Sequence, residues 1–321
     1  MVLDFYGLRE QPFGATPDPR FIYLGRSHRE ALASLQVGIT AGRGVMAVIA
    51  APGTGKTTLL YQLLEPLQTT ARTVFLFQTP GNRSELFRYM LRRLGQPSVG
   101  DDFATMHETL YDTLLAEWER GRRCVLVLDE AQNVEAPVLE AVRLLSDFET
   151  PSDKLLQIVL AGQPRLADTL SHSGFATLRQ RISMVVRVEP FSPPEVAVYI
   201  NHRLKIAGLD NPAVFSFNAL ALIAFATGGV PREIDNVCWN ALTLGYAMRA
   251  ERITEEIVQE VLGDLDLEPC REAVSRSESG WPHRLPLPRT PATVVPAEVL
   301  AAAIRSKATG RSVKRAAVNR W

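Results

Sequence analysis

The sequence has no excess charge of either sign, few cysteines and no internal repeat. Its 35 Lys and Arg residues equal its 35 Asp and Glu residues, so net charge alone does not point to a polyanionic partner. The three cysteines, Cys124, Cys238 and Cys270, lie far apart and match no metal-ligand spacing. Their scatter argues against a disulfide framework and is typical of a reducing compartment.

Signals for export and membrane insertion are also missing. Residues 1–5 lack a basic region followed by an apolar stretch, so no signal peptide is expected. The longest apolar run, near residues 214–227, contains Ser216 and Asn218. It is shorter than the roughly 20 apolar residues that a membrane span needs. We therefore expect a cytoplasmic protein without a transmembrane segment.

What the sequence does contain is an alternation of strand and helix patterns up to about residue 190. Five short apolar runs predict buried strands, and the amphipathic segments between them predict helices. This alternation predicts an α/β fold with a five-stranded parallel sheet flanked by helices. The strands are expected at residues 45–49, 73–77, 124–128, 155–161 and 185–188.

The character of the chain changes twice after this region. Ser192-Pro193-Pro194-Glu195 is a strong helix start, and four helices fit between Pro193 and about Leu265. We therefore expect an α/β core at residues 1–190 and a small helical lid domain at 191–267. Prolines recur from 268 onward, which predicts a linker and tail over 268–321, with a short helix near 296–304.

The last twenty residues carry six basic side chains and no acidic one. A run of this kind either remains a disordered, solvated tail or makes an electrostatic contact with nucleic acid or anionic lipid. The six residues are Arg305, Lys307, Arg311, Lys314, Arg315 and Arg320.

A phosphate-binding loop is predicted directly after the first strand. A turn of small residues lets backbone N–H groups surround phosphate oxygens, and the helix that follows points its free N–H groups at them. Lys56 is expected to reach the β- and γ-phosphates of ATP, and the Thr57 hydroxyl to bind Mg²⁺. The strict pattern has glycine at position 50, where this chain has Ala50. The expected nucleotide contacts are Ala51, Pro52, Gly53, Thr54, Gly55, Lys56, Thr57 and Thr58.

A second motif places two carboxylates at the end of the strand at 124–128. Ligands bind at the carboxyl ends of parallel strands, so Asp129 is expected to hold Mg²⁺ and Glu130 to act as the base toward the attacking water. One strand separates the two motif strands in the sequence. This spacing and the adjacent glutamate are typical of the AAA+ type of P-loop ATPase, in which a further strand is inserted between the motif strands in the sheet.

Resemblance to AAA+ proteins implies three further site residues. Gln163, after the fourth strand, resembles the polar residue that positions the attacking water. Arg181 resembles the arginine finger that reaches a neighbouring subunit's γ-phosphate, with Arg179 as the alternative. Arg232, in the turn and helix start Thr227-Gly228-Gly229-Val230-Pro231-Arg232, resembles the lid arginine that senses the γ-phosphate.

Longer segments resemble one AAA+ family, the ExeA or general secretion pathway protein A ATPases. The resemblance covers residues 1 to about 265. It suggests Tyr23 or Leu24 as adenine-pocket residues. Proteins of that family typically continue into a transmembrane helix and a peptidoglycan-binding domain, and neither is expected here. The resemblance is carried by residues 5–13, 16–24 and 28–32, by Asp129-Glu130-Ala131-Gln132-Asn133 and by Leu160-Ala161-Gly162-Gln163-Pro164.

The resemblance implies Mg²⁺-dependent hydrolysis of ATP, coupled to assembly of a secretion or envelope export system. The same core also resembles the transposition ATPases that load on DNA as helical oligomers, so a DNA-associated role, with the basic tail as a contact, stays open. Both alternatives imply an ATP-dependent homo-oligomer, as a ring or a filament. A non-hydrolysing scaffold is disfavoured by Glu130.

Overall fold

The described part of the chain forms two compact units. The structure, a computed structural model, describes residues 1–14, 18–77, 80–96, 100, 102–209 and 214–267. Unit 1 comprises Met1–Arg29, Ala51–Thr58 and the described residues from Val188 onward, and unit 2 comprises Glu30–Ala50 and Leu59–Arg187. The predicted linker, its short helix and the basic tail lie outside the described residues.

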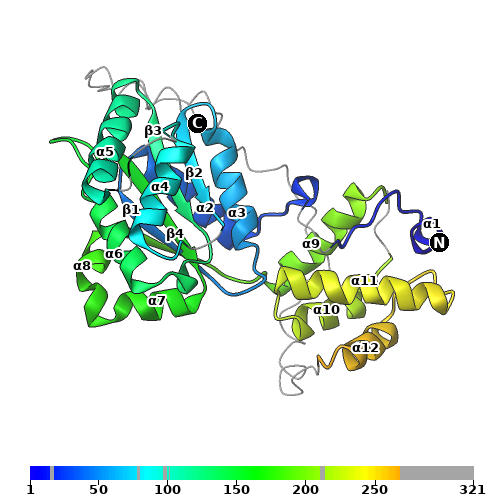
Figure 1. Cartoon of the computed structure of the whole chain (residues 1–321). Helices are drawn as coiled ribbons and strands as arrows, with labels where there is room; N and C mark the ends of the chain where they lie inside the picture. Colours follow the sequence, from blue (N-terminus) through cyan, green and yellow to red (C-terminus); the bar gives the residue numbers. More distant parts are fainter. Residues whose placement is uncertain (15–17, 78–79, 97–99, 101, 210–213, 268–321) are drawn as a thin grey trace, which may run out of the picture. The chain divides into compact units, whose positions relative to one another are not determined.

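Unit 2 is built on a five-stranded sheet with the strand order β2-β3-β4-β1-β5. Figure 1 labels β1 to β4 of this sheet, with helices around them. The pairs β2–β3, β3–β4 and β4–β1 are all parallel. Every residue of β1 and β4 is buried, because both faces of these aliphatic strands are covered. The predicted sheet is confirmed, including a strand, β4, inserted between the motif strands β1 and β3. The strands are β1 (Val45–Ala50), β2 (Ala71–Leu76), β3 (Arg123–Leu128), β4 (Leu156–Gly162) and β5 (Ile182–Val188).

Helices connect the strands and make up most of unit 1. Helices α4, α5 and α6 share one hydrophobic core with the strands, and the four helices predicted after Pro193 are confirmed as α9 to α12. No helix in the described ranges is long and apolar enough to cross a bilayer. The helices are α1 (Val2–Tyr6), α2 (Arg26–Thr40), α3 (Lys56–Leu64), α4 (Arg83–Arg93), α5 (Phe103–Glu119), α6 (Ala136–Leu145), α7 (Pro164–Ser171), α8 (Ala176–Arg181), α9 (Pro193–Ile206), α10 (Phe217–Ala226), α11 (Pro231–Ala247) and α12 (Glu255–Asp264).

The N-terminal segment packs on the helices of unit 1. The Tyr6 hydroxyl donates to the Ala250 carbonyl at 3.1 Å, and the Arg9 amide donates to the Ala207 carbonyl at 2.8 Å. Tyr6, together with other apolar residues of this segment, belongs to the same hydrophobic core as α9 to α12. The observed grouping therefore differs from a single sequence boundary near residue 190, because residues 1–29 and 51–58 make their contacts with this unit.

A buried ion pair fixes the N-terminal segment to α9 and α11. The Arg203 guanidinium donates to Asp235 at 2.9 Å, to the Tyr199 hydroxyl at 2.6 Å and to the Pro12 carbonyl at 2.5 Å. Burial raises the pKa of Asp235 to about 6, and the adjacent Arg203 charge opposes this rise. The carboxylate is therefore ionised at neutral pH, where it balances the buried guanidinium. These contacts hold the start of α11, which carries Arg232.

Candidate functional site

The phosphate-binding loop of unit 1 is a tight turn between β1 and α3. The Thr54 hydroxyl donates to the Ala51 carbonyl at 2.7 Å and closes the turn. Gly53 and Gly55 have φ values of 76° and 90°, the left-handed region that favours glycine. Helix α3 begins at Lys56, directly after the turn. A glycine-containing turn followed by a helix N-terminus is the kind of arrangement that binds phosphate groups.

Ala50 is compatible with this loop because it belongs to the strand. It is the last residue of β1, is buried, and is not among the described residues with positive φ. The glycine of the strict pattern is therefore not required by backbone conformation at this position. The left-handed conformations of the loop occur at Gly53 and Gly55.

The turn before α11 is hydrogen-bonded to the phosphate-binding loop. The Arg232 amide donates to the Gly53 carbonyl at 3.3 Å. A Cβ atom on Gly53 would approach Val230 Cγ1 to 2.9 Å, and one on Gly229 would lie 1.9 Å from the Phe191 carbonyl oxygen. Glycine is thus required at both positions for this close packing. Arg232, the predicted lid arginine, lies in the first turn of α11, directly beside the loop.

In unit 2, Asp129 and Glu130 follow the last residue of β3. The Asp129 amide donates to the Leu76 carbonyl at 3.1 Å, which continues the pairing of β3 with β2 by one residue. Asp129 is buried, and one of its carboxylate oxygens accepts the Glu130 amide at 2.8 Å. Glu130 itself has φ 52° without being glycine, a strained conformation that costs on the order of 1–3 kcal/mol. Strain of this kind is concentrated at functional sites.

Two glutamines hold the Glu130 carboxylate. The Gln132 side chain donates to it at 2.6 Å, and the Gln163 side chain donates to the same oxygen at 3.4 Å. The Gln132 side-chain oxygen in turn accepts the Gln163 amide at 3.0 Å. The predicted residues Glu130 and Gln163 are therefore brought together. Gln132, which joins Glu130 to Gln163, was not predicted as a site residue, although it lies only two residues after the glutamate.

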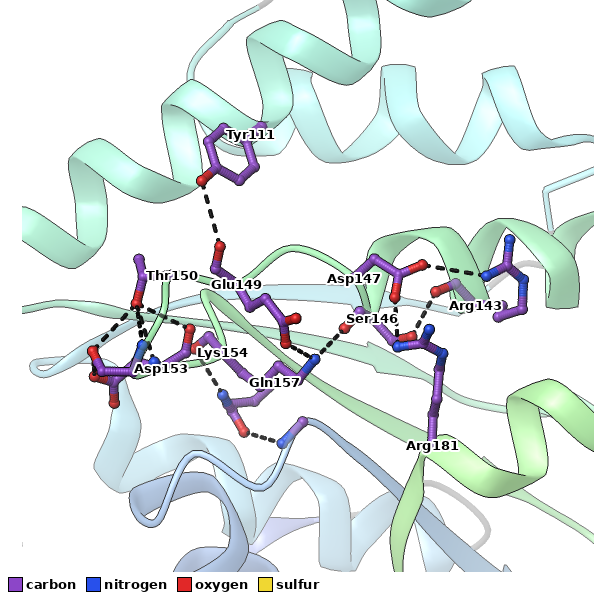
Figure 2. Close-up of polar contacts among 12 residues, drawn as sticks. Tyr111, Arg143, Ser146, Asp147, Glu149, Thr150, Asp153, Lys154, Gln157 and Arg181 are labelled. Carbon is purple, nitrogen blue, oxygen red and sulfur yellow. Dashed lines mark hydrogen bonds and ion pairs between the residues drawn. The ribbon is translucent and has the colours of Figure 1, made fainter.

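The arginine-finger candidates lie at the end of α8, in the same unit. The Arg181 guanidinium forms an ion pair with Asp147 at 2.5 Å, and Figure 2 shows Asp147 between Arg181 and Arg143. Arg179 donates to the Ser171 carbonyl at 3.3 Å. The Arg181 side chain is 35% exposed, so it remains accessible to a partner. Both candidates thus have a partner within this chain.

The predicted adenine-pocket residues precede α2, within unit 1. The Tyr23 ring packs against the rings of Phe191, Tyr199 and His202, with centroid separations of 5.3, 6.0 and 5.7 Å. This cluster belongs to the core of the unit. The Leu24 carbonyl accepts a hydrogen bond from Arg29.

The described residues contain no group of three or more His, Cys, Asp or Glu side chains that could enclose a metal ion. Mg²⁺ differs from many metals in that one or two protein ligands together with substrate phosphates suffice to bind it. The Thr57 hydroxyl and the Asp129 carboxylate have the hard oxygen donors that this ion prefers. Each of these two oxygen donors, one in each unit, is thus of a type that fits Mg²⁺ arriving with a nucleotide.

Comparison with known proteins identifies the same architecture. Residues 39–170 match the family described as AAA domain. General secretion pathway protein A of Aeromonas hydrophila is 34% identical over 282 residues, which are 88% of this chain and 50% of that protein. The chain thus spans about half the length of this curated relative.

Solved structures with the same fold include two ORC structures. The Aeropyrum pernix ORC2 protein, in ADPNP–ADP complexes, has a TM-score of 0.59 and 17% identity and covers 79% of this chain and 71% of its own. Drosophila ORC bound to DNA has a TM-score of 0.60 and 19% identity, over 83% of this chain and 66% of that one. At these identities the likeness shows the fold alone, which is the AAA+ fold.

Proposed function

We propose that this protein binds MgATP and hydrolyses it to ADP and phosphate. The premise is that the chain has an AAA domain of AAA+ fold and is homologous to general secretion pathway protein A. The observation that carries the proposal is the Glu130 carboxylate at the end of β3, held by Gln132 and Gln163. A carboxylate fixed in this way is suited to take a proton from water.

Each site residue has a distinct role in the proposed reaction. The Lys56 ammonium and the amides at the start of α3 bind the phosphates, while Thr57 and Asp129 would hold Mg²⁺, which would neutralise phosphate charge. Water attacks the γ-phosphorus, its proton passes to Glu130, and the bond from the γ-phosphorus to the β–γ bridging oxygen breaks. Gln163 orients the water, and Arg232 contacts the γ-phosphate from the lid. Because the reaction requires ATP, we propose that the protein acts in the cytoplasm.

For the process served, we propose assembly of a secretion or envelope export system. The support is the 34% identity to general secretion pathway protein A, which extends beyond the AAA domain to 88% of this chain. The alternative is a DNA-associated ATPase of the transposition type. Its sequence support is the resemblance of the core to transposition ATPases and the basic tail, which lies outside the described residues.

Duplex DNA separates these two alternatives. Under the export role, ATP turnover is expected to be unchanged by added duplex DNA at low salt, and the DNA is expected to show no mobility shift with the protein. If DNA stimulates turnover and the stimulation is lost as salt is raised, the export role is wrong and the transposition-type role is supported. A pull-down with Glu130→Gln under ATP would then identify the protein partner.

We expect Arg181→Ala to lose turnover while retaining ATP binding. An arginine finger stabilises the transition state of phosphoryl transfer and is worth about 10³-fold or more in kcat. The measurement is phosphate release, alongside nucleotide affinity, for Arg181→Ala and for the matched variant Arg179→Ala. If the finger acts between subunits, addition of wild-type protein to Arg181→Ala restores part of the activity. A monomer that turns over ATP at the full rate would contradict a finger acting in trans.

A further inference from the structure

A buried histidine of unit 1 contacts the phosphate-binding loop. His28 lies in the first turn of α2 and is only 2% exposed. Its Nε2 atom lies 2.7 Å from the carbonyl oxygen of Thr54. A Cβ atom on the next residue, Gly55, would lie 3.4 Å from the same nitrogen, so the ring is in direct contact with the loop.

The chemistry of this contact fixes the tautomer of the ring. A carbonyl oxygen only accepts, so Nε2 carries the proton and donates it. In the neutral ring, Nδ1 is then unprotonated, and it has no hydrogen-bond partner among the described residues. The ring therefore has one polar contact, and that contact is with the phosphate-binding loop.

The bond determines the orientation of one peptide group in the loop. In a planar trans peptide, the carbonyl and the following N–H point in opposite directions. With the Thr54 carbonyl held toward His28, the Gly55 N–H points away from the ring. Gly55 has φ 90° and little intrinsic conformational preference, so a contact on the Thr54 carbonyl helps to select one orientation.

His28 is itself held firmly by neighbouring elements of unit 1. Its ring lies 5.2 Å from the Phe191 ring, between centroids. The helix start beside it is fixed at two points: the Arg26 amide donates to the Glu195 carboxylate at 2.6 Å, and the Ser27 hydroxyl accepts the Glu189 amide at 2.8 Å. The imidazole is thus held in one position, from which it donates to the Thr54 carbonyl of the loop.

We infer that His28 is a positioning residue for nucleotide binding: it holds the Thr54–Gly55 peptide so that the Gly55 N–H is directed at the phosphates before ATP arrives. The inference rests on the proposed ATP binding at this loop. It differs from a role in core packing, because it depends on the donor atom of the ring and not on its volume.

Burial lowers the pKa of His28 below its ordinary value of 6.5, and Arg29 acts in the same direction, while the Thr54 carbonyl and Glu195 act against it. The ring is therefore neutral at neutral pH. Below pH about 6.5, the folded chain binds fewer protons at this site than the unfolded chain, so acid favours unfolding. The stability that wild type has over His28→Gln, measured without nucleotide, is expected to be constant above this pH and to shrink as pH falls through the folded pKa.

The test compares His28→Leu, which removes the donor, with His28→Gln, which keeps an N–H donor at a similar reach. We expect His28→Leu to weaken ATP binding by about tenfold, as for loss of one hydrogen bond that orders the site, and His28→Gln to remain within about threefold of wild type. His107→Leu, a histidine in the aromatic core of unit 2, is the matched control and is expected to leave ATP affinity unchanged.

Amide hydrogen exchange of residues 51–58 without nucleotide separates this inference from the proposed function. Faster exchange in His28→Leu than in wild type and His28→Gln supports the positioning role, whether or not ATP binds. Equal exchange and equal ATP affinity in all three proteins would overturn it. If exchange changes as expected but wild type fails to bind ATP, the proposed function is at fault, and with it the assignment of the Gly55 N–H to phosphate.

Discussion

Glu130→Gln is expected to retain ATP and to lose at least about a hundredfold in kcat. The amide has the shape of the carboxylate, and its oxygen still accepts hydrogen bonds from Gln132 and Gln163, which hold Glu130 in the native site. It accepts no proton from water, so only the chemical step is affected. Phosphate release measured alongside nucleotide affinity distinguishes a loss of chemistry from a loss of binding.

Glu135→Gln provides the matched control. Glu135 is an exposed carboxylate in the same segment, and its side chain makes no capping bond to α6. We expect this variant to turn over ATP at the wild-type rate. Normal turnover by Glu130→Gln would show that another group is the base, and the strained backbone of Glu130 would then need a different explanation.

Lys56→Ala is expected to abolish ATP binding, a loss of at least about a hundredfold in affinity. Lys56 is 7% exposed at the first position of α3, directly after the turn. In the proposed site its ammonium binds the phosphates. Alanine favours helix, so α3 and the loop are expected to keep their conformation. Binding of a fluorescent ATP analogue measures the effect, and circular dichroism checks the fold.

Lys205→Ala is the control for Lys56→Ala. Lys205 lies exposed in the last turn of α9, and its removal takes away the same charge elsewhere in unit 1. Nucleotide affinity is expected to be unchanged. Binding by Lys56→Ala at the wild-type level would place the triphosphate somewhere other than this loop.

The sequence predicted the features that short segments encode. Aliphatic runs marked the strands, most clearly β1 and β4, which are buried along their whole length. The run at 185–188 marked only the second half of β5, because this strand alternates exposed residues with less exposed ones. The Ser192 and Glu195 capping box marked the start of α9, and the structure contains it. The motif residues Lys56 and Asp129 fell at the start of α3 and just after β3, because each motif includes the element that presents it.

Features that depend on distant residues were not predicted. The Arg181–Asp147 pair joins the end of α8 to the segment that follows α6, and the Arg203–Pro12 contact joins residues 191 positions apart. His28 contacts Thr54 across 26 positions, with no local pattern that marks it. Long-range polar contacts of this kind depend on how elements pack, and periodicity does not report on packing.

The central claim, that this chain hydrolyses ATP with Glu130 as base, is tested most directly by phosphate release from ATP, with Glu130→Gln purified in parallel as the blank. The account predicts Mg²⁺-dependent turnover by wild type that exceeds the blank at least about a hundredfold, while both proteins bind ATP. Turnover no greater than that of Glu130→Gln, or equal turnover with Mg²⁺ removed, would contradict it.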